Sequence, residues 1–291
     1  MRYKGDGVLV CQRKFTMDLL KEYDYLTYSS VNSPLDPTIK LRNEDGALLP
    51  DPGYYKKLVG KLNFLTNTRL DIAYSVQHLS QFMQVSREPH LKAAIHVLRY
   101  LKKDITLRIF LSNGPNYTVS AYCDSDWAAC PDSRKCVSGY IVLLGDDPIS
   151  WKSKKQTTVS LSSTEAEYRS VMKVVGELVW VKRLLEELTV MCTNPITVFC
   201  DSQVVVHIAR NLVFHERTKH IEVDCHFVRD KIQEGLVELH HISTSDQLAD
   251  NLTKALTGIN HSDLLSKLAN LLSEAQRALQ WWKPNPFDLH S

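Results

Sequence analysis

The stretch from Thr118 to Val171 constrains the fold of this chain more than any other. It opens with TVSAYCDSDWA, where polar and apolar side chains alternate as in a half-buried strand that carries Asp124. It closes with SLSSTEAEYRSV, where Glu167 begins a series of apolar residues spaced three and four apart, as on one face of a helix. The sequence therefore predicts that a sheet supplies one carboxylate, from Asp124, and that a helix supplies another, from Glu167.

Two neighbouring acids compete with these two for a functional role. Asp126 falls on the same strand face as Asp124, so alternation alone does not separate them. Glu165 is rotated by roughly 200° from Glu167 toward Arg169, and we expect it on a solvated face near the helix N-terminus. A carboxylate on a buried stripe costs desolvation energy unless cations or hydrogen bonds stabilise it, so Glu167 indicates a metal site.

Two further acids follow later in the chain. The segment PITVFCDS predicts a short strand that ends at Asp201 and opens into a helix at 203–211. The carboxyl end of a strand is where α/β folds place their chemistry, but Asp201 or Ser202 can equally cap that helix. The segment STSDQLADNLTK predicts a capped helix with Asp250 beside its buried side and Asp246 as a competing acid in the first turn.

The order of these elements and their wording resemble a known family. The predicted order of elements resembles a type I ribonuclease H domain. That order is three strands, a helix, a strand, helices, a strand and a helix. The four acids lie on the first, fourth, fifth and last of these elements. The Pol polyproteins of Ty1/copia retrotransposons, especially those of plants, are similar in wording at YCDSDWA, SGYIVLLG, ISWKSKKQ, LSSTEAEY, FCDSQ, RTKHIEVDCHFVRD and DQLADNLTK. The resemblance implies an α/β fold with a ribonuclease H-like mixed five-stranded sheet and flanking helices, preceded by a small, mainly helical connection region.

With 291 residues and 44% hydrophobic content, the chain can form one large domain or two ordinary ones. By resemblance, we expect a reverse-transcriptase C-terminal segment similar to a thumb and connection at 1–112, the ribonuclease H-like domain at 113–257, and a helix and tail at 258–291. In the first segment the patterns predict a strand at 7–15, a short helix capped by Thr16, a polar loop, and amphipathic helices near 54–65, 71–83 and 89–101. The tail ends with Trp281 and Trp282, which suggest no chemistry.

A polymerase site is not expected. No Tyr-x-Asp-Asp signature occurs in the sequence, and the single Gly-Asp-Asp, at 145–147, lies between two apolar strands where glycine and aspartate are ordinary turn residues. The chain therefore resembles the carboxy-terminal fragment of a polyprotein, without the polymerase active site that lies upstream in such proteins.

The resemblance also implies a metal-dependent mechanism. Four converging carboxylates suit two Mg²⁺ or Mn²⁺ ions, which prefer oxygen ligands. In a two-metal site Asp124 would bridge both ions, Glu167 and Asp201 would bind the ion nearer the leaving group, and Asp250 would bind the ion that carries the attacking water. Four like charges raise one another's pKa values when no cation is bound, so metal binding should stabilise the fold.

Several polar residues are candidates for substrate contacts. Ser125, Ser202 and Gln203 adjoin the acids and are placed to contact the 2′-hydroxyls that distinguish RNA, although each is equally suited to capping or to the surface. Three lysines beside Trp151 form a basic cluster suited to phosphates, or an ordinary charged edge: Lys152, Lys154 and Lys155.

The charge is unevenly distributed along the chain. Residues 1–112 carry 17 lysine and arginine against 11 acidic residues, whereas the remainder carries 18 against 22. We expect the basic segment to contact nucleic acid, although so modest an excess also serves solubility.

Other site classes receive little support. No apolar run approaches the ~20 residues of a membrane span, and the start lacks a signal-type core, so we expect no membrane association and a cytoplasmic (virus-like particle) or nuclear location. The seven cysteines form no regular framework and are expected to be reduced. His215, His220, Cys225 and His226 give an incomplete zinc set.

The resemblance therefore implies a two-metal endonuclease that hydrolyses the RNA strand of RNA·DNA hybrids, with an upstream reverse-transcriptase domain or polyprotein as a partner and no small-molecule cofactor. A truncated or domesticated remnant that binds nucleic acid or a protein without turnover is the alternative, and a strand-transfer nuclease is a weaker third reading, since a fold does not fix a function. Cellular ribonucleases H carry a histidine in a loop before the last acid, whereas His240 and His241 fall in a predicted strand, which argues against a proton-shuttle role for them.

Overall fold

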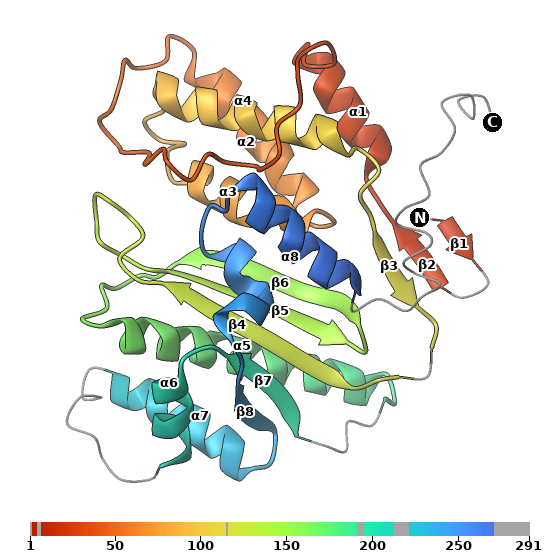
Figure 1. The fold of residues 1–291 in the computed structure, drawn as a ribbon, viewed down its shortest axis with the longest axis vertical. Helices are drawn as coiled ribbons and strands as arrows, with labels where there is room; N and C mark the ends of the chain where they lie inside the picture. The colour runs from red at the N-terminus through yellow and green to blue at the C-terminus, as the bar shows by residue number, and fades with distance from the viewer. Residues whose placement is uncertain (1, 5–6, 115, 191–194, 212–220, 271–291) are drawn as a thin grey trace.

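A mixed sheet of five strands, in the order β6-β5-β4-β7-β8, organises the second half of the chain (Figure 1). The computed structural model describes residues 2–4, 7–114, 116–190, 195–211 and 221–270. The strands are β4 (Val119–Asp126), β5 (Val137–Leu144), β6 (Asp147–Lys155), β7 (Ile196–Cys200) and β8 (Val237–His241). β4, β5 and β6 are antiparallel neighbours, whereas β7 lies parallel to β4 and β8 parallel to β7. The predicted α/β class, with a mixed five-stranded sheet and flanking helices, is confirmed.

Three helices cover one side of this sheet: α5 (Ser163–Glu187), α6 (Gln203–Arg210) and α7 (Glu222–Gln233) (Figure 1). The apolar stripe predicted for α5 is buried, and it forms one core with the alternating residues of β4. Its members include Val171, Val174, Leu178, Val181 and Leu185 from α5, and Val119, Ala121 and Cys123 from β4. Because Glu167 precedes this stripe, the same packing that orients α5 also orients its carboxylate.

The first part of the chain is mainly helical, with its own apolar core. It contains α1 (Arg13–Glu22), α2 (Pro52–Leu65), the 3₁₀ turn η1 (Leu70–Ile72), α3 (Ala73–Ser80) and α4 (Glu88–Lys103), together with a small sheet of β1 (Arg2–Lys4), β2 (Gly7–Val10) and β3 (Ile109–Ser112). The three amphipathic helices are confirmed, although the second one begins with η1 and ends at Ser80. The prediction that Thr16 caps α1 is wrong. Thr16 lies within that helix, and its hydroxyl donates to the carbonyl oxygen of Gln12 at 3.0 Å.

The helical part packs against the sheet on the side opposite α5, with α3 next to β6 (Figure 1). The indole Nε1 of Trp151 donates to the carbonyl oxygen of Thr66 at 2.9 Å, and the Lys155 ammonium donates to Gln81 Oε1 at 3.0 Å. Helix α8 (Gly258–Asn270) lies between the two parts, where Tyr100 and His261 form a buried hydrogen bond of 2.8 Å. These contacts join the helical part to the sheet and to α8.

The segment predicted as the last capped helix of the domain is not an α-helix. It consists of two 3₁₀ turns, η3 (Thr244–Asp246) and η4 (Leu248–Leu252). Gln247 between them is extended, and its side-chain amide donates to the carbonyl oxygen of Cys123 at 2.9 Å. This bond attaches the segment to β4 at the point where a regular helix would have to continue. The predicted helix is therefore wrong. Leu248, Ala249 and Leu252 are nevertheless buried as expected.

Other predictions fall on the described residues in part. His240 and His241 do lie at the end of β8. The six described cysteines carry no disulfide bond. Within the described ranges, no helix combines the length and the hydropathy needed to cross a membrane. His215, His220, Trp281 and Trp282 lie outside the described residues.

Candidate active site

Asp124 and Asp201 lie at the same edge of two parallel neighbouring strands. β4 and β7 are in register at Tyr122 and Phe199, and each acid follows its paired residue by two positions. The carboxyl ends of parallel strands share one edge of a sheet, so both carboxylates are delivered there. Asp124 is 4% exposed and Asp201 is half-buried.

Ser202 caps the helix that follows β7. The Ser202 hydroxyl accepts a hydrogen bond from the Val205 N–H at 3.4 Å, whereas the Asp201 carboxylate accepts one from the Thr244 hydroxyl at 3.0 Å. The capping interpretation therefore belongs to Ser202, and Asp201 remains directed toward the other acids.

Helix α5 brings Glu167 to this edge. One turn beyond Glu167, the buried Ser170 hydroxyl donates to the carbonyl oxygen of Asp124 at 2.7 Å. The N–H of Ser125, the next residue of β4, donates to Glu167 Oε1 at 3.3 Å. Two hydrogen bonds thus join the helix and the strand that carry the first two predicted acids.

The prediction that Glu165 lies on a solvated face is wrong, since this residue is 7% exposed. Its carboxylate accepts a hydrogen bond from the Leu161 N–H at 2.7 Å and pairs with Arg169 at 2.7 Å, while Ser162 accepts the Glu165 N–H at 3.2 Å. The loop before α5 folds over this turn and buries it, which helical periodicity alone does not reveal. Glu165 is a capping residue, as its position in the first turn suggests.

The last acid, Asp250, is carried by η4 and is held to β4 from both sides. Before it, Gln247 donates to the carbonyl oxygen of Cys123. After it, the fully buried Thr253 donates through its hydroxyl to Asp124 Oδ2 and contacts the carbonyl oxygen of Asp250 at 3.2 Å. The acid-bearing turn is therefore fixed relative to Asp124.

A glycine makes this close approach possible. Gly139 of β5 is paired with Asp124 across the sheet. A Cβ at position 139 would lie 2.7 Å from Leu252 Cβ and 2.8 Å from Thr253 Cγ2, closer than real side chains approach. The absence of a side chain here lets the turn of Asp250 rest directly on the sheet.

The charges of the four acids act on one another. Burial, followed by the charge of Asp124, raises the pKa of Glu167 to about 10 and that of Asp250 to about 7. The same two causes, in the same order, raise the pKa of Asp201. Hydrogen bonds join the segments of Glu167 and Asp250 to the strand of Asp124, and ligand atoms of Glu167 and Asp201 lie within 4.8 Å of one another, so the four predicted residues form one cluster.

One cation already borders the cluster. The Lys254 ammonium lies 2.9 Å from Asp250 Oδ1 and 4.0 Å from Asp124 Oδ2. It partly offsets the like charges of these two acids, and their charges in turn contribute to raising the Lys254 pKa above its ordinary value, against the effect of burial.

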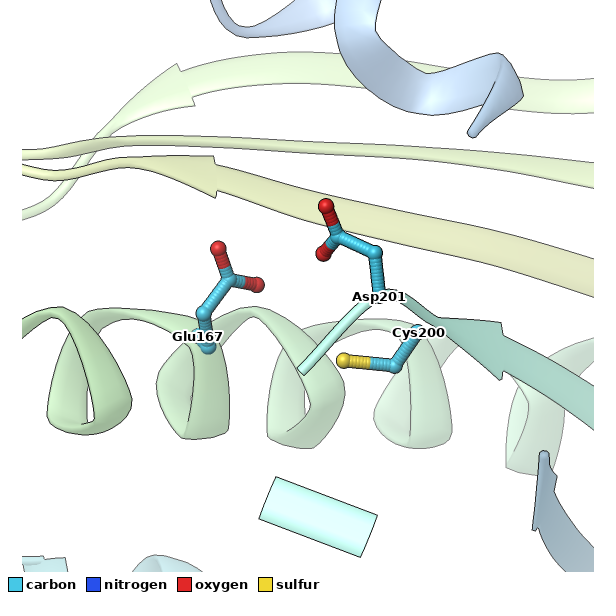
Figure 2. Close-up of side chains that lie close together, drawn as sticks. All are labelled: Glu167, Cys200 and Asp201. Atoms are coloured by element: carbon cyan, nitrogen blue, oxygen red, sulfur yellow. The ribbon is translucent and has the colours of Figure 1, made fainter. Parts of the chain in front are cut away.

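Glu167 carries the clearest sign of a missing partner. Its Oε2 atom is buried and has no hydrogen-bond partner among the described residues. Figure 2 shows the carboxylates of Glu167 and Asp201 directed to the same side of α5, with the thiol of Cys200 below them. Ligand atoms of these three residues all lie within 4.8 Å of one another. Oxygen atoms in such an arrangement fit a hard divalent cation such as Mg²⁺ or Mn²⁺.

The two competing acids lie in different environments. Asp246 is exposed and pairs with Lys267 at 3.3 Å. Asp126 is half-buried and lines a separate hollow of about 290 Å³ between the sheet and the helical part, which Lys254 also lines. Burial raises the pKa of Asp126, the charge of Lys254 opposes this, and the charge of Asp124 adds to it, so Asp126 lies within reach of the cluster.

The predicted polar contact residues fall in different environments. The Ser125 side chain is internal: the residue is 7% exposed, and its hydroxyl donates to the carbonyl oxygen of Val137 at 3.2 Å. Ser202 is half-buried as the cap of α6, whereas Gln203 is exposed beside Asp201.

The basic cluster on β6 divides between two faces. Lys152 and Lys154 are exposed and line a hollow beside α5. Lys155 is half-buried on the opposite face, where its ammonium bonds to Gln81 of the helical part. The alternation of an edge strand explains this division.

Sequence reasoning missed three residues that support the acids. Thr253 and Lys254 follow Asp250 by three and four positions. Their supporting roles could be predicted from the pattern DNLTK only after Asp250 itself had been assigned to the site. Gln156 is 3% exposed, and its amide donates to Ser138 at 2.9 Å and to the Ala166 carbonyl oxygen at 3.0 Å. Nothing in the sequence around Gln156 marks it as buried.

Comparison with known sequences places these residues in a family. The retrovirus-related Pol polyprotein from transposon RE1 of Arabidopsis thaliana is 44% identical over 262 residues, which are 90% of this chain and 18% of that polyprotein. The Pol polyprotein from transposon TNT 1-94 of Nicotiana tabacum is 32% identical over 271 residues. An uncharacterized mitochondrial protein of Arabidopsis thaliana is 36% identical over 175 residues, which are 72% of its length. The chain spans about a fifth of the length of the polyproteins it matches.

No family model matches the chain. Among solved structures, the N-terminal RNase H domain of a Mycobacterium tuberculosis protein has a TM-score of 0.36 at 15% identity, over 53% of this chain and 97% of that chain. LC11-RNase H1 in complex with an RNA/DNA hybrid has a TM-score of 0.35 at 15% identity, over 47% of this chain and 94% of that chain.

Over 90% of its length, the chain is a close homologue of the retrovirus-related Pol polyproteins of copia-type transposons.

Proposed function

We propose that this chain is a ribonuclease H that hydrolyses the RNA strand of RNA·DNA hybrids with two Mg²⁺ or Mn²⁺ ions. Asp124, Glu167, Asp201 and Asp250 would hold the ions. The observation that carries the proposal is the buried, unpartnered Oε2 of Glu167 in a cluster where the Asp124 charge contributes to the raised pKa values of the other three acids. An unpaired buried carboxylate is costly, and a hard cation removes that cost.

The chemistry that such ions supply when bound is activation of a water and stabilisation of the leaving oxygen. The chain's own contribution is positioning. Ser170 fixes the helix of Glu167 to the strand of Asp124, and Gln247 and Thr253 fix the turn of Asp250 to the same strand. The assignment of individual acids to individual ions stays a prediction.

Substrate selection would depend on groups near this edge that remain accessible. Gln203 is exposed next to the acids, and Ser202 is half-buried, so these two side chains are better placed than the internal Ser125 to contact 2′-hydroxyls. Other domains of the polyprotein are proposed as partners, because the relatives are several times longer than this chain.

The test is cleavage of an end-labelled RNA·DNA hybrid beside duplex RNA and duplex DNA, each with Mg²⁺ and with chelator. The proposal predicts cutting of the RNA strand of the hybrid alone, lost in Asp124→Asn and in chelator. Binding of the hybrid without cutting by the folded wild-type protein would identify a remnant that recognises nucleic acid. Cutting of duplex DNA would instead indicate a strand-transfer nuclease.

A further inference from the structure

A second hollow, of about 310 Å³, lies between β6 and α5 on the outer edge of the sheet. Three lysines line it: Lys152 and Lys154 from the edge strand and Lys173 from the helix. Lys152 and Lys154 are two positions apart and so share one face of β6. Lys173, by contrast, is half-buried. One of the three cations therefore lies inside the hollow, whereas the two exposed lysines lie at its rim.

The ammonium groups around this hollow are not neutralised by ion pairs. Burial, then the positive charges of Lys154, Arg169 and Lys152, lower the pKa of Lys173 to about 8. Arg169 is paired with an acid, but the ion pairs between described residues include none of the three lysines. Three cations that repel one another around one hollow are stabilised when an anion lies between them.

Two acidic residues lie close enough to the three lysines to offset part of their positive charge. Glu177 lines the hollow, and its carboxylate accepts a hydrogen bond from the Ser150 hydroxyl at 2.7 Å. The charge of Asp224 acts to raise the pKa of Lys173, but the lowering by burial and by the neighbouring cations is larger. The balance around the hollow therefore stays positive, with three lysines against one lining carboxylate.

Hydrogen bonds connect the hollow to the acid cluster. The Lys173 ammonium donates to the Ser138 hydroxyl at 3.3 Å, and the Gln156 amide donates to Ser138 at 2.9 Å and to Ser125 Oγ at 3.3 Å. Ser125 follows Asp124 in β4 and donates its N–H to Glu167. Lys173 is thus held at a fixed offset from the acids by buried side chains, and Lys152 and Lys154 face the same hollow from β6.

We propose that Lys152, Lys154 and Lys173 bind a backbone phosphate of the substrate duplex, away from the phosphate that is cut. This inference rests on the proposed function, which supplies the duplex. Phosphates repeat regularly along a duplex, so a second backbone contact at a fixed offset sets which phosphate reaches the acids. Lys155 takes no part, because it lies on the other face of β6 and bonds to the helical part.

The test is hybrid binding as a function of salt. In the cleavage-disabled Asp124→Asn protein with Mg²⁺, the affinity for a labelled RNA·DNA hybrid is measured by fluorescence anisotropy between about 50 and 200 mM NaCl. Lys154→Ala with Lys173→Ala should weaken binding by roughly 5- to 10-fold and reduce the salt slope by about one, as loss of one phosphate contact does. The double Lys→Arg variant should retain the slope.

Lys182→Ala is the matched control, because Lys182 lies on the same helix and is half-buried but pairs with Glu186 at 4.0 Å. It should leave affinity and slope unchanged, and thermal unfolding confirms that each variant is folded. An unchanged slope in the folded alanine double variant overturns the phosphate site, whether or not the wild type cuts hybrids. A reduced slope in a protein whose wild type cuts nothing supports the site and overturns the proposed activity.

Discussion

The Ser170 hydroxyl donates a hydrogen bond of 2.7 Å to the carbonyl oxygen of Asp124, and so joins the helix of one proposed ligand to the strand of another. The same hydroxyl lies 3.3 Å from the carbonyl oxygen of Gly139, on the strand that neighbours Asp124. Ser170 is completely buried, so water cannot replace it in these contacts. Ser170 therefore joins the turn of α5 that carries Glu167 to the end of β4 that carries Asp124.

Ser170→Ala should therefore reduce both stability and turnover. Loss of the buried hydroxyl removes its hydrogen bonds to the carbonyl oxygens of Asp124 and Gly139, at a cost of about 1–3 kcal/mol in the free energy of unfolding, measured by urea denaturation. Hybrid cleavage should show a lower kcat with a nearly unchanged KM. Ser266→Ala is the control, since Ser266 is an exposed residue of α8 whose hydroxyl donates to the carbonyl oxygen of Ser262 at 2.9 Å, and its loss should change stability by less than about 0.5 kcal/mol. Equal effects of the two substitutions would contradict this role for Ser170.

Gly139→Ala should displace the turn that carries Asp250. The new methyl group would overlap Leu252 and Thr253, and overpacking of this kind costs about 1–3 kcal/mol. Metal affinity should fall together with stability, because Thr253 also donates to Asp124. The comparison is Gly176→Ala, a helical position with nothing within 4 Å of its Cβ, which should stabilise the protein by up to about 1 kcal/mol. Undiminished metal affinity in a folded Gly139→Ala protein would show that the turn does not depend on this contact.

The metal-free protein should become less stable as pH rises. Burial and the Asp124 charge raise the pKa of Asp250 to about 7 in the folded state, so its carboxyl favours folding while protonated. That contribution is complete below the unfolded-state pKa of about 4 and is lost as pH rises through about 7. With chelator present, the free energy of unfolding should fall across this window by an amount on the order of a few kcal/mol.

Asp250→Asn tests this origin of the pH dependence, because an amide does not titrate. Its stability should change less between pH 4 and 7 than that of the wild type. Parallel curves for the two proteins would show that Asp250 is not the group responsible.

Much of the sheet was predictable because local patterns and tertiary packing agree there. Alternation in β4 and the apolar stripe of α5 describe the two faces of one core, and the apolar run before Asp201 marks β7. The same agreement made the four acids visible as candidates. Their convergence depended on the parallel register of β4 and β7, which the resemblance to ribonuclease H supplied and the periodicity did not.

The failures occur where long-range contacts override local preference. Gln247 bonds to β4, so the segment around Asp250 forms 3₁₀ turns although its sequence favours a capped helix. Glu165 is covered by the loop before α5. Helical periodicity describes only the faces of the helix, so it does not predict burial by a neighbouring loop. The roles of Thr253 and Gln156 were hidden for the same reason, since their partners lie far away in the chain.

The most direct measurement of whether the four acids form one metal site is calorimetric titration of the metal-free protein with Mn²⁺ at pH 7, repeated in buffers of different ionisation enthalpy. Burial and the Asp124 charge hold the pKa of Glu167 near 10 and that of Asp250 near 7, so metal binding must displace protons from both. The account predicts saturable binding with release of about one to two protons per molecule. Release should fall by about one proton in Glu167→Gln. Binding without proton release, or equal release in the variant, would contradict the assignment of Glu167 as a metal ligand.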